Sequence, residues 1–337
     1  MKSESVQQFN ESEPPDRKDR ARVAAVRSRP IGATARRLLP LLAFVVTAVL
    51  LTGLQLSDRM RMPAREALLE ASRHLQEAAG EDSLILVRPP WFNEGRIGLE
   101  GLHLHPATPL DPLELHPFRE VFVAQGRGRR SALEVELAAV LEEEGPLFES
   151  PRWRVKRYRT ALPWLVHWDS LAALQDATIR RHAEGAAGVS CRLGHGRSIH
   201  CGRVDPWVYA ADTWREMEDL RPQWCIGLAV PHDQERMTFE WDEVPLGSQL
   251  RIRAGNDVHA TRSPRGADVT MTVSLDDTVV WERAFPPREE PYLLEDIEVP
   301  GGSDAARLGV SLHTEDALDR FFCFRVFSYT ETGAPQR

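Results

Sequence analysis

Two cysteines and two histidines lie within eleven residues of one another: Cys191, His195, His200 and Cys201. Two sulfurs and two imidazoles could bind zinc, but zinc ligands usually occur as C-x₂₋₄-C and H-x₃₋₅-H pairs, and only the two histidines have such spacing. Glycines between the cysteines suit a tight reversal of the chain. A disulfide between Cys191 and Cys201 is therefore favoured over a metal site.

Cys225 and Cys323 complete the set of four cysteines, which allows three pairings. These two residues begin and end a region whose pattern predicts one β-domain, so we expect them to form a second disulfide that closes a loop of nearly 100 residues. No cysteine stands apart from the others as a catalytic thiol would.

Neighbouring carboxylates are the candidates for acid–base catalysis. Glycoside hydrolysis needs two carboxyl groups about 5–9.5 Å apart across a cleft, whereas neighbours on one strand or turn are more typical of solvated surfaces. The sequence contains no P-loop, G-x-G-x-x-G, H-E-x-x-H or G-x-S-x-G motif. We therefore predict no catalytic residue and no cofactor, although enzymatic activity stays an open alternative. The pairs are Glu240 with Asp242, Asp276 with Asp277, and Glu295 with Asp296.

Three histidines, His103, His105 and His116, lie in the proline-rich segment LHLHPATPLDPLELHP. His103 and His105 would share one side of a strand and could form a metal pair. Scattered histidines in a proline-rich loop are the simpler interpretation, so no metal site is predicted.

Aromatic residues give the best indication of a ligand site. Aromatic faces beside polar donors commonly fix a ligand such as a sugar ring. Arg253, Asn256, Asp257 and His259, in and after one predicted strand, would form the polar half of such a site, with Trp281 as an aromatic partner. The alternative is that the aromatic residues fill a core and the loop is only a turn. The aromatic residues of this region are Trp207, Tyr209, Trp214, Trp224, Trp241, Trp281, Phe285 and Tyr292.

The elements that would position these residues are short strands separated by turns. From about residue 171 no helical pattern interrupts them, and Asp276-Asp277-Thr278 predicts a hairpin turn. Such a pattern is typical of an antiparallel β-sandwich of the jelly-roll type. The predicted strands are 177–181, 190–193, 199–203, 224–229, 236–241, 249–254, 269–275, 279–285, 292–299, 307–312 and 320–329.

An α/β layer precedes the strands. Apolar spacing predicts a helix over 64–80 that ends at Gly80, and apolar runs predict buried strands at 83–87 and 120–124. Ser131 is expected to cap a second helix that ends at Gly145, and 152–160 alternates like an edge strand. The region is too short for a complete doubly wound enzyme.

A single apolar segment dominates the N-terminal part. Residues 38–57 carry no charge over twenty positions, which is enough for a helix to cross a bilayer core of about 30 Å. Arginines precede it, so the positive-inside rule places the N-terminus in the cytoplasm. A cleaved signal peptide or a twin-arginine export signal, suggested by Arg36-Arg37, is the alternative, but the run exceeds a usual h-region and no A-x-A site follows it.

The charge is distributed unevenly. The chain carries a net charge of −8, and residues 1–37 hold nine Lys/Arg against five Asp/Glu, so the other 300 residues have a balance of −12. An acidic body argues against nucleic-acid binding. The polar residues 1–29 are expected to form a disordered tail.

Residues 224–329 resemble galactose-binding-like β-sandwiches, which occur in carbohydrate-binding modules. The resemblance rests on CIGLAVP, FEWDEVPLGSQLRIRAG, DVTMTVSLDDTVVWERAF and RFFCFRVFSY, and it implies a fold more securely than an activity. Residues 82–160, with DSLILVRPPW, FREVFVAQG and WRVKRYRT, are similar to the extracytoplasmic α/β portions of some bacterial membrane glycosyltransferases. That second likeness would imply an accessory domain without the transferase centre.

Together these patterns predict a single-pass membrane anchor followed by an α+β ectodomain. The expected parts are a cytoplasmic tail (1–37), a transmembrane helix (38–57), a small α/β domain (58–168), a linking β-region with a disulfide hairpin (169–222) and the sandwich (223–331). We expect a bacterial inner-membrane protein whose C-terminal domains are periplasmic and which binds an envelope glycan, a lipid-linked sugar or a membrane-protein partner without catalysis. The alternatives are a carbohydrate-active enzyme or transferase-associated subunit, and a purely structural assembly partner with a contiguous apolar patch.

Overall fold

The chain forms two compact units, residues 1–61 and 62–337. The computed structural model describes residues 40, 42–53, 63–88, 96, 98–105, 111–126, 137, 139–182, 188–193, 198–201, 209–216, 222–231, 235–258, 266–287, 292–299, 304–316 and 320–332. The predicted tail and parts of the predicted span (38, 39, 41 and 54–57) lie outside these residues.

In the first unit, residues 42–53 are helical and their apolar side chains, such as Leu42, Phe44 and Val49, are exposed. None of the helices in the described ranges is both long enough and apolar enough to cross a membrane.

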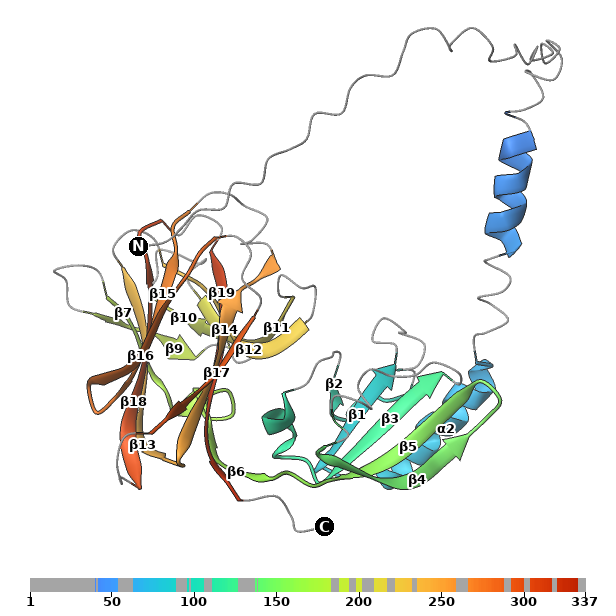
Figure 1. Cartoon of the computed structure of the whole chain (residues 1–337), viewed down its shortest axis with the longest axis horizontal. Coiled ribbons are helices and arrows are strands. Elements are labelled where there is room, and N and C mark those ends of the chain that lie inside the picture. Colours follow the sequence, from blue (N-terminus) through green and yellow to red (C-terminus); the bar gives the residue numbers. More distant parts are fainter. Residues whose placement is uncertain are drawn as a thin grey trace, which may run out of the picture. The chain divides into compact units, whose positions relative to one another are not determined.

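The second unit begins with a mixed five-stranded sheet in the order β2-β1-β3-β5-β4 (Figure 1). β1 pairs in parallel with β2 and β3, whereas β5 pairs antiparallel with β3 and β4. The helix α2 (Arg65–Ala78) buries Leu68, Ala71 and Leu75 against one face of this sheet, which confirms the amphipathic pattern. The strands are β1 (Ser83–Arg88), β2 (Leu104–His105), β3 (Glu120–Gly126), β4 (Leu141–Glu149) and β5 (Trp153–Thr160).

The structure contradicts two predictions in this sheet. The C-terminal part of the helix predicted to end at Gly145 is the strand β4, whose Glu142, Glu143 and Glu144 lie along β5. Basic side chains on β5 pair with these glutamates, and such cross-strand charge pairs outweigh the helical spacing of the leucines. As a result β5 is an interior strand between β3 and β4, and its prediction as an edge strand is wrong.

Two antiparallel sheets form the sandwich (Figure 1). One has the order β17-β14-β19-β12-β11-β10-β9, with β6 also paired to β19, and the other has the order β16-β15-β18-β13-β7-β8. Alternating side chains such as Ile252, Phe324 and Phe239 fill the core between them. The strands are β6 (Trp164–Asp169), β7 (Thr178–His182), β8 (Val189–Ser190), β9 (Arg192–Leu193), β10 (Ser198–His200), β11 (Tyr209–Glu216), β12 (Pro222–Ala229), β13 (Arg236–Pro245), β14 (Gln249–Asn256), β15 (Val269–Leu275), β16 (Thr278–Phe285), β17 (Leu293–Glu298), β18 (Ala305–Thr314) and β19 (Phe321–Glu331).

The predicted antiparallel sandwich is confirmed, with local differences. Asp276 and Asp277 both have positive φ, 45° and 66°, as the predicted tight hairpin requires. The single strand predicted over 190–193 is wrong, because β8 and β9 belong to different sheets and Cys191 lies where the chain changes sheet. Residues 169–222, expected as a linking region, supply strands to both sheets.

Both predicted disulfides are present. Cys191 bonds to Cys201 and Cys225 bonds to Cys323, with sequence separations of 10 and 98. The first joins the segment between β8 and β9 to the end of β10, and the second links the neighbouring strands β12 and β19. Because both sulfurs of the first pair are bonded to each other, the zinc alternative is wrong.

Candidate functional site

Four of the five residues predicted to bind a ligand are buried in the sandwich. Arg253 is 2% exposed, and Asn256 and Asp257 are also buried. Trp281 is 8% exposed and packs against Phe285 in the core. His259 lies outside the described residues. Their role in ligand binding stays a prediction.

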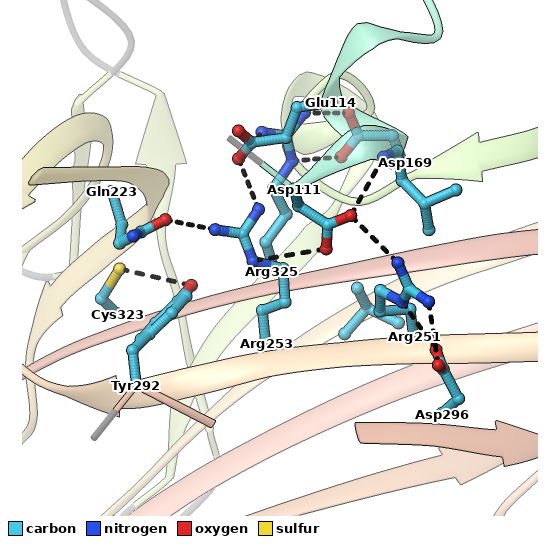
Figure 2. Close-up of polar contacts among 12 residues, drawn as sticks. Asp111, Glu114, Asp169, Gln223, Arg251, Arg253, Tyr292, Asp296, Cys323 and Arg325 are labelled. Carbon is cyan, nitrogen blue, oxygen red and sulfur yellow. Dashed lines mark hydrogen bonds and ion pairs between the residues drawn. The ribbon is translucent and has the colours of Figure 1, made fainter. Parts of the chain in front are cut away.

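Arg253 is part of a buried ion cluster on the outer face of the β14–β19 sheet (Figure 2). Its Nη1 donates to Glu114 Oε1 and its Nη2 donates to Gln223 Oε1. Its guanidinium also lies 5.2 Å from the centroid of the Tyr292 ring. Glu114 comes from η3 (Pro112–Leu115), a 3₁₀ helix in the segment between β2 and β3.

Two further arginines complete this cluster. Arg325 binds Asp169 through two hydrogen bonds of 3.0 and 2.6 Å, and its Nη1 also donates to Glu114 Oε1 at 3.0 Å. Arg251 Nη1 donates to Asp111 Oδ1 at 3.0 Å (Figure 2). The Arg251 side chain also binds Asp296 through Nε and Nη2, at 2.7 and 2.9 Å.

Strand alternation explains why these charges meet. Leu250, Ile252 and Ala254 of β14 point into the core, so Arg251 and Arg253 point to the opposite face. Arg325 lies directly across from Arg253 in the β14–β19 register. Side chains three residues apart eclipse one another in a 3₁₀ helix, which allows η3 and its N-cap to present Asp111 and Glu114 together.

The arginines of the cluster are held in their ionised form. Burial opposes the charge of Arg253, but Glu114 and Asp111 outweigh this penalty and raise the pKa of Arg253. Burial raises the pKa of Tyr292 to about 12, so its hydroxyl stays protonated at neutral pH. The charged guanidinium of Arg253 and its paired contacts therefore give this cluster a structural role.

Sequence reasoning missed the partners in this cluster. Arginines at alternate positions of otherwise apolar strands, such as Arg253 and Arg325, indicate buried cations that need counter-ions. The carboxylates come from Asp111, Glu114 and Asp169. Glu114, for example, lies 139 residues before Arg253 in the chain. The sequence carries no signal of which carboxylates would pair with them.

A separate, solvent-facing hollow lies on the five-stranded sheet β2-β1-β3-β5-β4, called the α/β sheet below. Its volume is about 520 Å³. Its arginines and glutamates form a ladder across β3, β5 and β4: Arg157 donates to Glu120, Arg157 Nε lies 3.1 Å from Glu144 Oε2, and Arg159 donates to Glu144. The lining residues are Arg119, Glu120, Glu144, Arg157, Arg159 and Thr160. Planar guanidinium and carboxylate groups can each make paired hydrogen bonds to a ligand with neighbouring oxygens.

Two of the candidate carboxylates have arginine partners in the structure. Asp277 pairs with Arg307, and Glu295 lies 3.9 Å from Arg283. His116 binds the carbonyl of Leu113. Within the described part of the chain, no group of three or more His, Cys, Asp or Glu side chains could hold a metal ion.

The comparisons with known proteins show likeness of fold only. No protein-family model and no curated protein matches the chain. A CBM51 module from Clostridium perfringens GH95, in complex with methyl-galactose, is 11% identical over 44% of this chain and 99% of that chain, with a TM-score of 0.27. The CBM51-2 and INT domains of Clostridium perfringens ZmpB, in complex with GlcNAc, are 9% identical over 50% of this chain and 41% of that chain, with a TM-score of 0.28. TmCBM61, in complex with beta-1,4-galactotriose, is 11% identical over 49% of this chain and 97% of that chain, with a TM-score of 0.24.

These structures contain carbohydrate-binding modules. The identities and TM-scores are low, so the function proposed below rests on this chain's own residues. The likeness of residues 82–160 to glycosyltransferase portions stays a prediction.

Proposed function

We propose that this chain is a non-catalytic carbohydrate-binding protein, anchored in a bacterial inner membrane through residues 38–57, with its α/β sheet and sandwich outside the cytoplasm. The observation that carries the proposal is the hollow on the α/β sheet. Its lining offers planar donors and acceptors to a ligand rich in hydroxyl groups, such as an envelope glycan or the sugar of a lipid-linked precursor.

The bonding of the buried carboxylates supports binding without catalysis. Asp111, Glu114 and Asp169 each lie against an arginine in the ion cluster. A general acid must come within hydrogen-bond reach of its substrate, whereas these three carboxylates are buried inside the cluster.

The disulfides support an extracytoplasmic location. All four cysteines of the chain are paired, and structural disulfides form and persist in oxidising compartments.

The helix at residues 42–53 supports the anchor. The hydroxyl of Thr47 donates to the carbonyl of Ala43 at 2.9 Å, and that of Thr52 donates to the carbonyl of Ala48 at 2.8 Å. Both polar side chains therefore have partners within the helix, which reduces the cost of placing this segment in lipid.

A glycan-array experiment on the full chain, purified under oxidising conditions in mild detergent, tests this function. We expect saturable binding to at least one carbohydrate that is weakened by Arg159→Gln. The matched control is Arg180→Gln, because Arg180 is exposed on β7 in the sandwich and does not line the hollow. A folded chain that binds no carbohydrate would overturn the proposal and point to a membrane-protein partner, to be sought by crosslinking in the membrane.

A further inference from the structure

We infer that the hollow on the α/β sheet selects carbohydrates that carry an oxyanion, a carboxylate or a phosphate, over neutral carbohydrates. This inference rests on the proposed function and names the ligand class of the same site.

The balance of donors and acceptors in the hollow is the first argument. Arg157 donates a hydrogen bond to one oxygen of Glu120, and Arg159 donates one to Glu144 Oε1. The second oxygen of Glu144 lies 3.1 Å from Arg157 Nε as an ion pair. The hydroxyl of Thr160 is engaged with the carbonyls of Phe118 and Arg119. Each guanidinium has more N–H groups than these contacts use, so the capacity left for a ligand consists mainly of donors.

The exposure of the lining side chains is the second argument. The side chains of Arg119 and Arg159 are 87% and 66% exposed, whereas those of Glu120 and Glu144 are 24% and 26% exposed. A ligand that enters the hollow therefore has better access to Arg119 and Arg159 than to the two carboxylates.

The charge of the hollow is the third argument. The lining contains three arginines and two glutamates, so the formal charge of the lining residues is +1. Asp82 lies 3.6 Å from Arg119 Nε, but both side chains are exposed, and such surface pairs are weak and easily displaced. The hydrogen bond from Arg157 to Glu120 raises the pKa of Arg157, so the ladder keeps its charge.

The guanidinium groups of Arg119 and Arg159 can bind an oxyanion by paired N–H···O contacts. Charge-assisted hydrogen bonds of this kind are roughly twice as strong as neutral ones. A neutral hydroxyl offers a weaker acceptor and no charge, so it would benefit less from Arg119 and Arg159.

The test measures binding of the full chain to matched saccharides that share one linkage. The probes are a glucuronate-terminated oligosaccharide, its glucose-terminated counterpart, a glucose 1-phosphate-terminated counterpart and inorganic phosphate alone. We expect at least one of the two anionic saccharides to bind about tenfold more tightly than the neutral one, with a preference that weakens as salt increases.

The variants assign this preference to the hollow. Arg119→Gln and Arg159→Gln should each reduce the preference, and Arg180→Gln should leave it unchanged. A stronger response to the uronate identifies a carboxylate ligand, and a stronger response to the sugar phosphate identifies a phosphate ligand. Inorganic phosphate that binds as tightly as every saccharide would contradict the inference, since the sugar would then contribute nothing.

The failure of the inference is distinguishable from the failure of the proposed function. Equal binding of neutral and anionic saccharides would overturn the inference and leave the carbohydrate function standing. Absence of binding to every saccharide by a folded chain would overturn both.

Discussion

Glu114 and Arg253, 139 residues apart in the chain, form a buried ion pair that joins the 3₁₀ helix η3 to strand β14. The same carboxylate oxygen also accepts a hydrogen bond from Arg325. One carboxylate oxygen therefore bridges two neighbouring arginines on one face of the sandwich, and the segment between β2 and β3 is held to that face through it (Figure 2).

The first prediction concerns this pair. Glu114→Gln should lower the free energy of unfolding by about 3–5 kcal/mol, because it leaves the buried Arg253 without its closest counter-ion. Chemical denaturation of the full chain measures the loss. Asp242→Asn, at an exposed position of β13, is the control and should change stability by less than about 0.5 kcal/mol. Equal effects of the two substitutions on the free energy of unfolding would show that the ion pair between Glu114 and Arg253 does not stabilise the protein.

The second prediction compares the disulfides. In the chain-entropy model the bond between Cys225 and Cys323, with a separation of 98, contributes about 5 kcal/mol, and the bond between Cys191 and Cys201, with a separation of 10, about 3 kcal/mol. Replacing Cys225 and Cys323 by serine should therefore lower the denaturation midpoint more than replacing Cys191 and Cys201. The opposite order would indicate that local strain or structure in the unfolded chain dominates.

The third prediction is a pH dependence centred on His116. Burial lowers the pKa of His116 from its ordinary value of 6.5, more than Asp169 raises it. The unfolded chain therefore binds this proton more readily, so the contribution of His116 to stability is present above about pH 6.5 and is lost as the pH falls through its folded pKa.

The measurement for His116 is the free energy of unfolding at a series of pH values between about 7.5 and 5. His116→Gln should flatten the decline in stability at acid pH relative to the unchanged chain. His200→Gln removes an exposed histidine from β10 and should leave the slope as it was. Identical slopes in all three proteins would contradict the prediction.

The fourth prediction concerns Gly247, between β13 and β14. A Cβ atom at this position would lie 2.1 Å from the carbonyl oxygen of Tyr329, and this contact involves backbone that cannot turn away. Gly247→Ala should therefore destabilise the protein by about 1–3 kcal/mol, measured as a lower thermal midpoint. Gly126→Ala is the matched control, because its Cβ would meet only the carbonyl oxygen of Arg152 at 3.9 Å.

Much of the sandwich could be predicted from the sequence because its strands alternate cleanly between core and surface. β13, β15 and β18 each bury every second residue over most of their length, and Asp276-Asp277 marks the turn between two of the strands. The disulfides followed from the same pattern, since Cys225 and Cys323 lie on strands that had been recognised.

The prediction was weaker where charge pairs between distant segments decide the structure. The segment with the glutamates of β4 was predicted as a helix, because its basic partners lie on another segment, β5. The strands β6 and β11 were not predicted. The candidate site is the extreme case, because Arg119, Arg157 and Arg159 acquire a shared ligand-facing surface only through strand pairing. Local sequence patterns do not encode which segment of the chain supplies the counter-charge.

The measurement that tests the central claim most directly is an isothermal titration of the full chain with the tightest-binding glycan of the array. It compares the unchanged protein with Arg159→Gln and Arg180→Gln. The side chain of Arg159 is largely exposed, so Arg159→Gln should fold normally, as a denaturation curve would verify. We predict that Arg159→Gln binds about tenfold more weakly while Arg180→Gln binds as the unchanged protein does. Equal affinities of all three proteins would contradict the assignment of the hollow as the carbohydrate site.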